Sequence, residues 1–229
     1  MSQDRRYSFE FFPTKTDAGH EKLIATARQL ASYNPDFFSC TYGAGGSTRD
    51  RTINTVLQLE SEVKIPAAPH LSCVGDSKAD LRSLLSQYKA AGITRIVALR
   101  GDLPSGMGMA SGELRHANDL VEFIREETGE HFHIEVAAYP EMHPQARNFE
   151  DDLLNFVRKA NAGANSAITQ YFFNADSYFY FVDRVRKMGV DIPVVPGIMP
   201  IIVYSKLARF SDACGADIKR SIRKQLESG

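Results

Sequence analysis

The chain has 229 residues, of which 43% are apolar, and a formal net charge of -1. This length suits one large domain or two small ones, and the near-neutral charge argues against nucleic acid or a membrane surface as the main partner. The opening residues lack the apolar core of a signal peptide, no apolar run approaches membrane-spanning length, and the three cysteines form no C-x-x-C pair. We therefore expect a soluble cytoplasmic protein with inert buried thiols at Cys40 and Cys73, without a disulfide framework or a zinc site.

Short apolar runs alternate with amphipathic segments along the whole chain. The runs predict β-strands over residues 7–12, 37–42, 67–73, 95–101, 133–140, 166–173 and 193–200. The amphipathic segments predict helices, for example over residues 21–33, 78–92, 113–129 and 149–163. Three helices end in a basic residue followed by a glycine, at Gly92, Gly163 and Gly189, a pattern typical of helix termination.

Seven strand–helix units with short loops predict a parallel α/β fold in a single domain spanning residues 1–229. No glycine fingerprint follows the first strand, which runs into "FFPTKT", so an open dinucleotide-binding sheet is disfavoured. We therefore predict a (β/α)8 TIM barrel. An eighth strand is not found in the sequence, because the tail from Ser205 onward is helical in pattern, so the predicted barrel lacks its last βα unit.

Polar residues gather at the carboxyl ends of many of the predicted strands. They are Glu10, Thr41, His70, Asp102, Glu141 and Gln170. In a (β/α)8 barrel these strand ends form one rim, which carries the active site. The pattern therefore indicates an enzyme with its site at this rim.

Glu10 interrupts the aromatic stretch "YSFEFFP" near the start of the chain. Strand alternation puts Tyr7, Phe9 and Phe11 on one face and Glu10 on the other. Because burying a charge is costly, either this strand is an edge with Glu10 in water, or Glu10 points into a cavity where a carboxyl group is needed. A barrel strand has no solvent face, so the predicted fold favours the barrel mouth.

Other candidates each have a structural alternative. For "LRGDLP", a catalytic Asp102 on the rim and a purely structural salt bridge of Arg100 are about equally supported. The glycine-rich stretch 41–52 fits ligand binding or a tight turn equally. Tyr139 and His143 in "AAYPEMHP" suit a bound ligand, with Tyr139 packing on a flat ring. Metal binding is disfavoured, because His70 is the only other histidine at a strand end.

Two further positions remain open on spacing alone. Arg158 and Lys159 either complement a helix dipole or hold an anionic group. Gln170, an amide in the apolar run "ITQYFF", either belongs to a core hydrogen-bond network or binds the edge of a heterocycle.

Several motifs together resemble the methylenetetrahydrofolate reductase family of the bacterial flavoprotein type. They are "SFEFFP", "TYGAGG", "APHLSC", "VALRGDLP", "VAAYPEMHP", "ITQYFF" and "PGIMPI", in the family's order and over nearly the whole chain. The resemblance implies a TIM barrel that binds FAD and passes hydride from NADH or NADPH to 5,10-methylenetetrahydrofolate in a ping-pong reaction. It also implies small-molecule substrates only, and we expect a homo-oligomer.

The resemblance assigns roles to individual residues. Glu10 would be the general acid that protonates N10 of the folate, Asp102 would tune the flavin and folate, and Gln170, Asp102 and Phe210 would contact substrate. We expect desolvation to raise the pKa of Glu10, as a general acid at neutral pH requires. The implied flavin contacts are Thr41, Tyr42, Ala44, His70, Arg100, Gly101, Asp102, Tyr139, His143, Ala146, Asp152, Asn155, Arg158 and Lys159.

The sequence also departs from the family pattern. Ile201, Ile202 and Val203 stand where relatives carry polar residues and Asn or Gly, and the expected last unit with a substrate-holding arginine is absent. An open barrel would expose two strand edges. The alternative function is therefore a truncated or inactive homologue that retains only flavin or pterin binding, or a self-association surface.

Overall fold

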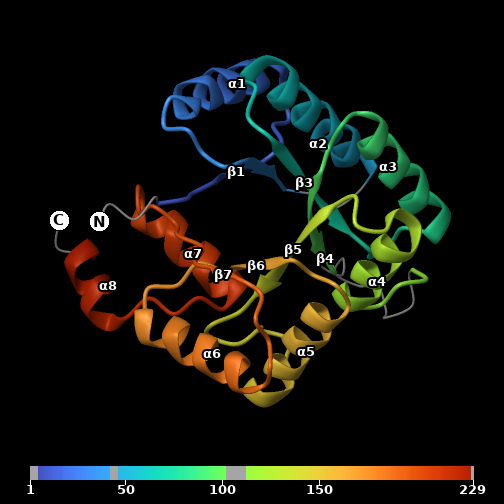
Figure 1. Ribbon diagram of the computed structural model, residues 1–229. Helices are drawn as coiled ribbons and strands as arrows, with labels where there is room; N and C mark the ends of the chain where they lie inside the picture. The colour runs from blue at the N-terminus through green and yellow to red at the C-terminus, as the bar shows by residue number, and fades with distance from the viewer. Residues whose placement is uncertain (1–4, 42–45, 102–111, 228–229) are drawn as a thin grey trace. The chain divides into compact units, whose positions relative to one another are not determined.

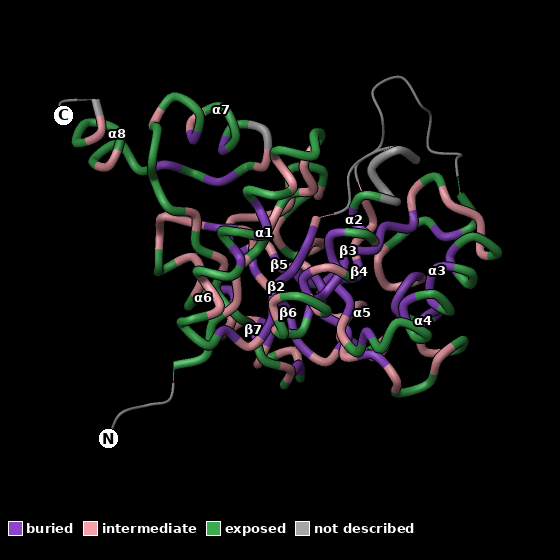
Figure 2. The backbone as a smooth tube through the Cα atoms, turned by 90° about the horizontal axis from the view of Figure 1, so that it is seen from above, coloured by how far each residue is buried: buried purple, intermediate pink, exposed green. Residues whose placement is uncertain are grey.

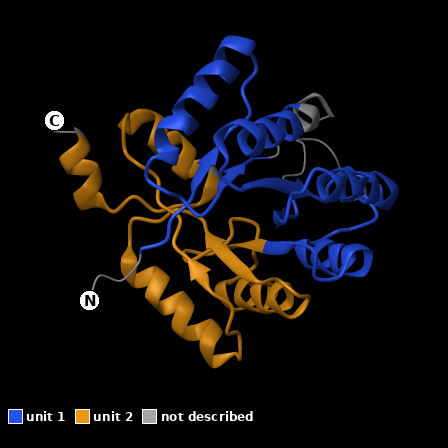
Figure 3. Ribbon diagram, turned by 45° about the horizontal axis from the view of Figure 1, so that its top comes forward, with its two compact units in different colours: residues 1–134 blue, residues 135–229 orange. Residues whose placement is uncertain are grey.

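The computed structural model describes residues 5–41, 46–101 and 112–227. Strands and helices alternate along the chain, and the strand order is the chain order, β1 to β7 (Figure 1). All the strand pairs with a described register are parallel. Seven strands, each followed by a helix, confirm the predicted (β/α) barrel-type fold with seven of its eight units. The chain divides into two compact units, residues 1–134 and 135–229 (Figure 3), which are described separately below.

The first unit holds the first four strands and their helices. Its elements are β1 (Phe9–Phe11), α1 (Asp17–Ala31), β2 (Phe38–Cys40), α2 (Gly46–Gln58), the π-helix η1 (Leu59–Val63), β3 (Ala67–Ser72), α3 (Lys78–Ala90), β4 (Arg95–Leu99) and α4 (Ala117–Thr128). All nine residues of β2 and β3 are buried, as Figure 2 shows. They form the centre of this unit's core, against which α2 packs.

The second unit starts within the fifth strand and continues to the end of the chain. Its elements are β5 (His133–Ala138), α5 (Phe149–Asn161), β6 (Ser166–Thr169), α6 (Ala175–Lys187), β7 (Val194–Val195), α7 (Tyr204–Cys214) and α8 (Arg220–Glu227). Phe156 of α5 meets Phe181 of α6 edge to face, with ring centroids 5.1 Å apart. A second buried cluster joins Tyr171 to Leu207, Ala216 and Ile218.

Local sequence signals explain where the helices begin and end. The Thr16 side chain accepts a hydrogen bond from the Gly19 N–H at the start of α1, and Ser77 forms a capping box with Asp80 at the start of α3. The predicted helix-ending glycines adopt positive φ angles, 82° at Gly92, 113° at Gly163 and 84° at Gly189. These local predictions are therefore confirmed.

The strands are shorter than the apolar runs predicted. β7 contains only Val194 and Val195, whereas the prediction covered residues 193–200. Pro196 and Pro200 lack the N–H that a strand ladder needs, and Gly197 lies so close to the end of β6 that an added Cβ would be 2.2 Å from the Thr169 carbonyl oxygen. The chain therefore leaves the sheet soon after β7 begins. No helix among the described residues is long and apolar enough to cross a membrane.

Candidate active site

A carboxylate, a hydroxyl and an imidazole come together near the carboxyl ends of β1, β2 and β3 in the first unit. Glu10 is aligned with Ser39 in the parallel β1–β2 register. Nε2 of His70, on β3, lies 3.3 Å from a carboxylate oxygen of Glu10. The His70 side chain is 8% exposed and that of Glu10 is 45% exposed. A buried imidazole therefore holds a carboxylate that solvent can still reach.

The alternation predicted for β1 is confirmed. The rings of Phe9 and Phe11 pack on Phe38 of β2, at centroid distances of 6.2 Å and 5.3 Å. Glu10 lies on the opposite face, toward Ser39 and His70. β1 is also the first strand of the order, so the edge-strand interpretation was partly right. Glu10 combines partial exposure with specific partners.

The predicted rise in the pKa of Glu10 is wrong, because its pKa is lowered. Burial is the largest single influence and pushes this pKa upward. The hydrogen bond and positive charge contributed by His70, together with a hydrogen bond from Ser39, outweigh it. Without a ligand, Glu10 is therefore ionised near neutral pH. The sequence prediction failed because it counted desolvation and left out two partners on neighbouring strands.

The thiols close to this cluster are inert, as predicted. Burial, strengthened by the charge of Glu10, raises the pKa of Cys40 to about 12. Burial likewise raises the pKa of Cys73 to about 11. Because thiolates are the nucleophilic form of cysteine, neither group is suited to nucleophilic chemistry at neutral pH.

The segment after β4 brings Arg100 and Gly101 to the end of β3. The Ser72 hydroxyl donates to the Arg100 carbonyl at 2.8 Å. Gly101 has a φ of 89°, and an added Cβ would lie 1.9 Å from the Ser72 Oγ. Only glycine fits this close approach without displacing Ser72. Thr41 is tied to β1, since its N–H donates to the Phe11 carbonyl at 2.9 Å.

Three predicted site residues lie outside the described residues: Tyr42, Ala44 and Asp102. The predictions for them, including the catalytic role of Asp102, remain predictions.

In the second unit, the loop after β5 groups Tyr139 with His143. Their rings meet edge to face with centroids 4.5 Å apart. The His143 N–H donates to Oδ2 of Asp152 at 2.8 Å, and its carbonyl accepts from the Ala146 N–H at 2.9 Å. Met142 has a φ of 76°, which is uncommon for a residue other than glycine and recurs at functional sites. The loop and the start of α5 therefore bring together Tyr139, His143, Ala146 and Asp152, and the flavin contacts that the resemblance implies for them stay predictions.

Lys159 reaches from the last turn of α5 into the interior of the second unit. Its ammonium donates to the Ala137 carbonyl and lies 6.0 Å from the centre of the Tyr139 ring. Desolvation lowers the pKa of Lys159 to about 8, and nearby Asp152 only partly opposes this. Arg158 behaves differently, because its exposed guanidinium donates to Asn155 at 2.6 Å. Lys159 is thus the cation of this pair that is held in a desolvated setting.

Gln170 follows β6 and is held by its neighbour Tyr171 and by the end of β5. Its carboxamide oxygen accepts from the Tyr171 N–H at 3.0 Å, and its backbone N–H donates to the Ala138 carbonyl at 2.8 Å. It also borders a small cavity of about 10 Å³, close to the room one water molecule needs. The residues around this cavity are Tyr139, Pro140, Glu141, Met142, Gln170, Tyr171, Phe172, Cys214, Gly215 and Ala216.

Sequence reasoning missed a polar network that joins the end of β6 to α7. The Tyr171 hydroxyl is 2.9 Å from the hydroxyl of Ser211 and accepts from the Cys214 thiol at 3.3 Å. The Tyr171 ring also stacks on Phe210, at 6.1 Å and 16°, and Phe210 is 45% exposed. No spacing pattern links these residues, because α7 is separated from β6 by another helix and strand.

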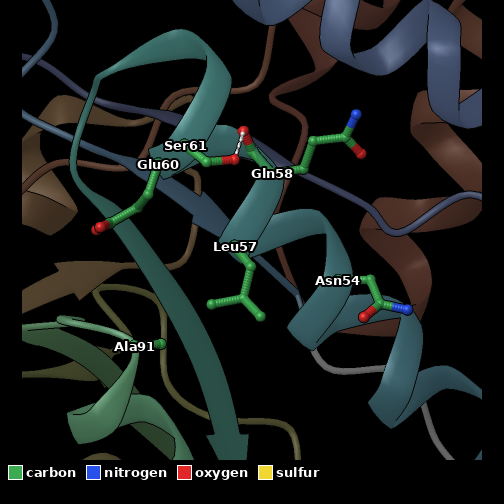
Figure 4. A pocket seen from close by; sticks show the side chains of 6 residues that line it. All are labelled: Asn54, Leu57, Gln58, Glu60, Ser61 and Ala91. Atoms are coloured by element: carbon green, nitrogen blue, oxygen red, sulfur yellow. Dashed lines mark hydrogen bonds between the residues drawn. The ribbon is translucent and has the colours of Figure 1, made fainter.

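An open hollow in the first unit lies away from the predicted site residues. It measures about 510 Å³ and is lined by Asn54, Leu57, Gln58, Glu60, Ser61 and Ala91 (Figure 4). Glu60 accepts from the N–H of Ala67, the first residue of β3. The hollow is therefore at the amino end of this strand, whereas the site in parallel βα proteins is at the carboxyl end.

The fold and the strand-end residues together define an enzyme of the (β/α) barrel type. A family model described as methylenetetrahydrofolate reductase matches residues 1–228. The chain belongs to the methylenetetrahydrofolate reductase family, whose members in these comparisons are oxidoreductases.

Named relatives agree with this family. The chain is 43% identical over 205 residues to 5,10-methylenetetrahydrofolate reductase of Escherichia coli (strain K12). This alignment covers 90% of this chain and 68% of that protein. It is 36% identical over 233 residues to methylenetetrahydrofolate reductase (NADH) 1 of Arabidopsis thaliana, covering 96% of this chain and 39% of that one.

Two solved structures share the fold at low sequence identity. One is an uncharacterized protein from Clostridium thermocellum that binds two copies of 5-methyl-5,6,7,8-tetrahydrofolic acid. It has a TM-score of 0.68 at 17% identity, covering 97% of this chain and 76% of that chain. The other is a phosphonopyruvate hydrolase, with a TM-score of 0.58 at 11% identity, covering 98% and 90%. At these identities the likeness concerns the fold alone.

Proposed function

We propose that this chain reduces 5,10-methylenetetrahydrofolate to 5-methyltetrahydrofolate, with NADH or NADPH as the electron source and FAD as the bound intermediary, in a ping-pong reaction. The family match over residues 1–228 supports the substrate class. The observation that carries the proposal is Glu10, held by Ser39 and His70 near the carboxyl ends of three neighbouring parallel strands. A general acid must be positioned in this way, with partners that fix its orientation.

Lys159 provides the structural test for whether the chain suits a flavin dinucleotide. Its ammonium is desolvated and its pKa has dropped to about 8, so an anion beside it would stabilise the charged form and raise this pKa again. The diphosphate of FAD is such an anion, and the exposed Arg158 adds a second cation. The charges present in the second unit therefore fit this cofactor. When bound, the flavin would accept a hydride from the nicotinamide and later release it to the folate.

We propose the following residues of each unit as cofactor contacts, as the family resemblance implies them. In the first unit they are Thr41, His70, Arg100 and Gly101, with Tyr42, Ala44 and Asp102 beyond the described residues. In the second unit they are Tyr139, His143, Ala146, Asp152, Asn155, Arg158 and Lys159. Gln170 and Phe210 would contact the folate, together with Asp102.

Glu10 needs a change of environment before it can donate a proton. Its carboxylate is ionised in the ligand-free protein because His70 and Ser39 stabilise the charge. Its side chain is 45% exposed, so a ligand that covers it would remove water and raise its pKa. Folate binding would thereby favour protonation of Glu10 before the proton passes to N10. The lowered pKa is compatible with acid catalysis only if the substrate excludes water.

The test uses the colour of the bound flavin. The purified protein, reconstituted with FAD, should be yellow, and anaerobic NADH or NADPH should bleach it. Methylenetetrahydrofolate should then restore the colour and yield 5-methyltetrahydrofolate. If no flavin binds after reconstitution, the proposal is wrong. Bleaching without reoxidation by the folate would point to an altered folate site.

Self-association is a second candidate function, favoured by an apolar run before α7. Ile198 is 81% exposed, Ile202 is 89% exposed and Val203 is 44% exposed. Contiguous exposed apolar residues mark interaction surfaces. Analytical ultracentrifugation should then show a homo-oligomer that an Ile198→Ser, Ile202→Ser variant dissociates. A monomer at all concentrations would exclude this candidate.

A further inference from the structure

We propose that His70 and Glu10 form a proton-sharing pair, in which His70 positions Glu10 and supplies the proton that Glu10 delivers to the substrate. This inference rests on the proposed folate reduction for its chemical purpose. Its structural content, a proton held jointly by the two side chains, can be tested without flavin or folate.

The contact between the two side chains is specific. Nε2 of His70 lies 3.3 Å from Oε2 of Glu10. Nε2 is buried, and within the described part of the chain no group forms a hydrogen bond of good geometry with it. A buried imidazole nitrogen needs a polar neighbour, and the carboxylate is the group placed to provide it. The two residues are therefore matched to each other.

Register keeps the pair together. In the β1–β2 pair, Glu10 is aligned with Ser39. In the β2–β3 pair, the next residue, Cys40, is aligned with Pro69, which directly precedes His70. Ser39 is 3% exposed and hydrogen-bonds to Glu10. Rigid adjacent strands thus hold the carboxylate from two sides, which limits the rotamers that Glu10 can adopt.

The neighbouring elements carry further charged and titratable groups. From β2, Cys40 contributes a thiol whose pKa is raised to about 12, so it stays neutral. The segment after β4 contributes Arg100, whose Nε donates to the Gly101 carbonyl. From α2, Arg51 donates to the Thr14 carbonyl at 2.9 Å. A guanidinium group stays charged in proteins, so Glu10 and His70 are the acid–base pair of this cluster.

The proton balance of the proposed step is simple. Before the reaction, the pair holds one proton and has no net charge, as an imidazolium and a carboxylate. The proton moves from Nε2 to the carboxylate, and from there to the substrate nitrogen. The pair is left as a neutral imidazole and a carboxylate with a net charge of -1, while the substrate gains one positive charge. A proton from water then restores the pair. The apparent pKa values of such a pair belong to both residues together.

If His70 had only a structural role, no proton would be shared between His70 and Glu10. The test compares His70→Gln with a matched control, His131→Gln. Gln at position 70 can still donate a hydrogen bond to Glu10 but carries no titrating proton. His131 is in the same unit, and its Nε2 contacts only the Ile93 carbonyl, at 3.0 Å, in the contacts described for it.

The first measurement uses the protein without flavin. Carboxyl ¹³C NMR, with the Glu10 signal assigned by its loss in Glu10→Gln, should show the Glu10 midpoint moving upward in His70→Gln and unchanged in His131→Gln. If His70→Gln does not fold, the wild type and Glu10→Gln still decide the point. The ¹⁵N shift of His70 Nε2, which reports its proton, should differ between these two proteins. Identical Nε2 signals, or an unmoved Glu10 midpoint, would overturn the pairing.

The second measurement uses FAD-saturated enzyme and compares two half-reactions per bound flavin. In His70→Gln, reoxidation by the folate should slow about 10-fold to 100-fold more than bleaching by NADH does. The pH dependence of the folate half-reaction should also change shape. An equal loss in both half-reactions with an unchanged pH profile would mean that His70 serves flavin binding only. If no flavin binds at all, the proposed function fails, while the NMR result on the pair stands.

Discussion

Glu10 in the first unit and Lys159 in the second both have a lowered pKa, but the shift means opposite things for their charge. For the carboxyl group of Glu10 it favours the ionised form, because His70 and Ser39 outweigh burial. For the amine of Lys159 it favours the neutral form, because burial outweighs Asp152. Both are near the interior of their units. The two groups differ in charge preference because Glu10 has two polar side chains that stabilise its charge, whereas among the described residues Lys159 has only nearby Asp152 to oppose desolvation.

Register explains why the two residues differ in partners. Glu10 is on a strand whose parallel neighbours present side chains at the same level, so two polar groups meet it. Lys159 comes from a helix and ends at a backbone carbonyl, a weaker partner for a cation than a carboxylate. The charge of Glu10 is therefore stabilised by side chains of its own unit, whereas the charge of Lys159 would be stabilised by a bound anion.

The largest expected effect comes from removing the ionisable group of the first unit. Glu10→Gln should lower the rate of folate reduction about 10³-fold, because general acid catalysis typically contributes 10²–10⁴. Bleaching of the bound flavin by NADH should stay within a few-fold of the wild type, since no proton from Glu10 is proposed for that step. Stopped-flow absorbance separates the two. Equal loss of both half-reactions would assign Glu10 a structural role.

The buried amine predicts how stability depends on pH. Below pH 8, Lys159 is charged in both folded and unfolded chains, so the desolvation cost is fully present. The cost disappears as the pH rises from about 8 to 10.5, so the free energy of unfolding should increase over this window. In Lys159→Met this increase should vanish, and the variant should be about 2 kcal/mol more stable at pH 7, at ~1.4 kcal/mol per pKa unit with a discount for partial exposure.

Urea titrations from pH 7 to pH 10.5, on protein without flavin, would measure this difference. Lys187→Met is the matched control, since Lys187 is exposed in the last turn of α6 and pairs with Asp183. Lys187→Met should leave the increase in the free energy of unfolding with pH the same as in the wild type. If the stability of the wild type fell steadily across this pH range, parallel to that of Lys159→Met, the proposed desolvation cost of Lys159 would be wrong.

The uncharged hydrogen-bond network around Tyr171 should affect the free energy of unfolding less than the buried Lys159 does. Tyr171→Phe removes the hydroxyl that contacts Ser211 and Cys214, and leaves the Ser211 hydroxyl, in a residue 1% exposed, without that partner. We expect a loss of about 1–2 kcal/mol in urea denaturation. In the control Tyr180→Phe, where the ring is 52% exposed, the change should be within about 0.5 kcal/mol. Equal losses would mean that burial is not the cause.

The smallest effect should come from a local cap in the first unit. Ser77→Ala removes the capping box of α3 and should cost about 1 kcal/mol. Ser83→Ala, at an exposed position of the same helix, should be neutral or slightly stabilising because alanine is the better helix former. Thermal unfolding of both variants measures the contrast. A stabilised Ser77→Ala variant would show that the cap is not used in solution.

Much of the fold could be predicted because its signals are local. Helix ends at Gly92, Gly163 and Gly189 follow from neighbouring residues, and strand alternation placed Glu10 opposite Phe9 and Phe11. The strand limits were less accurate, because apolar runs continue past the last ladder hydrogen bond, as at β7. The site was predicted only in outline. Tyr139, His143 and Asp152 do come together, but the Tyr171 network was missed, since nothing in the spacing links Tyr171 to Ser211.

The sequence by itself determined the alternation of strands and helices and the glycines that end three of the helices, because periodicity and capping depend on near neighbours. Only the tertiary structure decided the charge of Glu10. "YSFEFFP" shows a carboxyl group among aromatic residues, which indicates burial and a raised pKa. Ser39 and His70 are distant in the chain, but parallel strand pairing brings them to that carboxyl group, and they lower its pKa instead. A pKa depends on every group within a few ångströms, and folding chooses those groups.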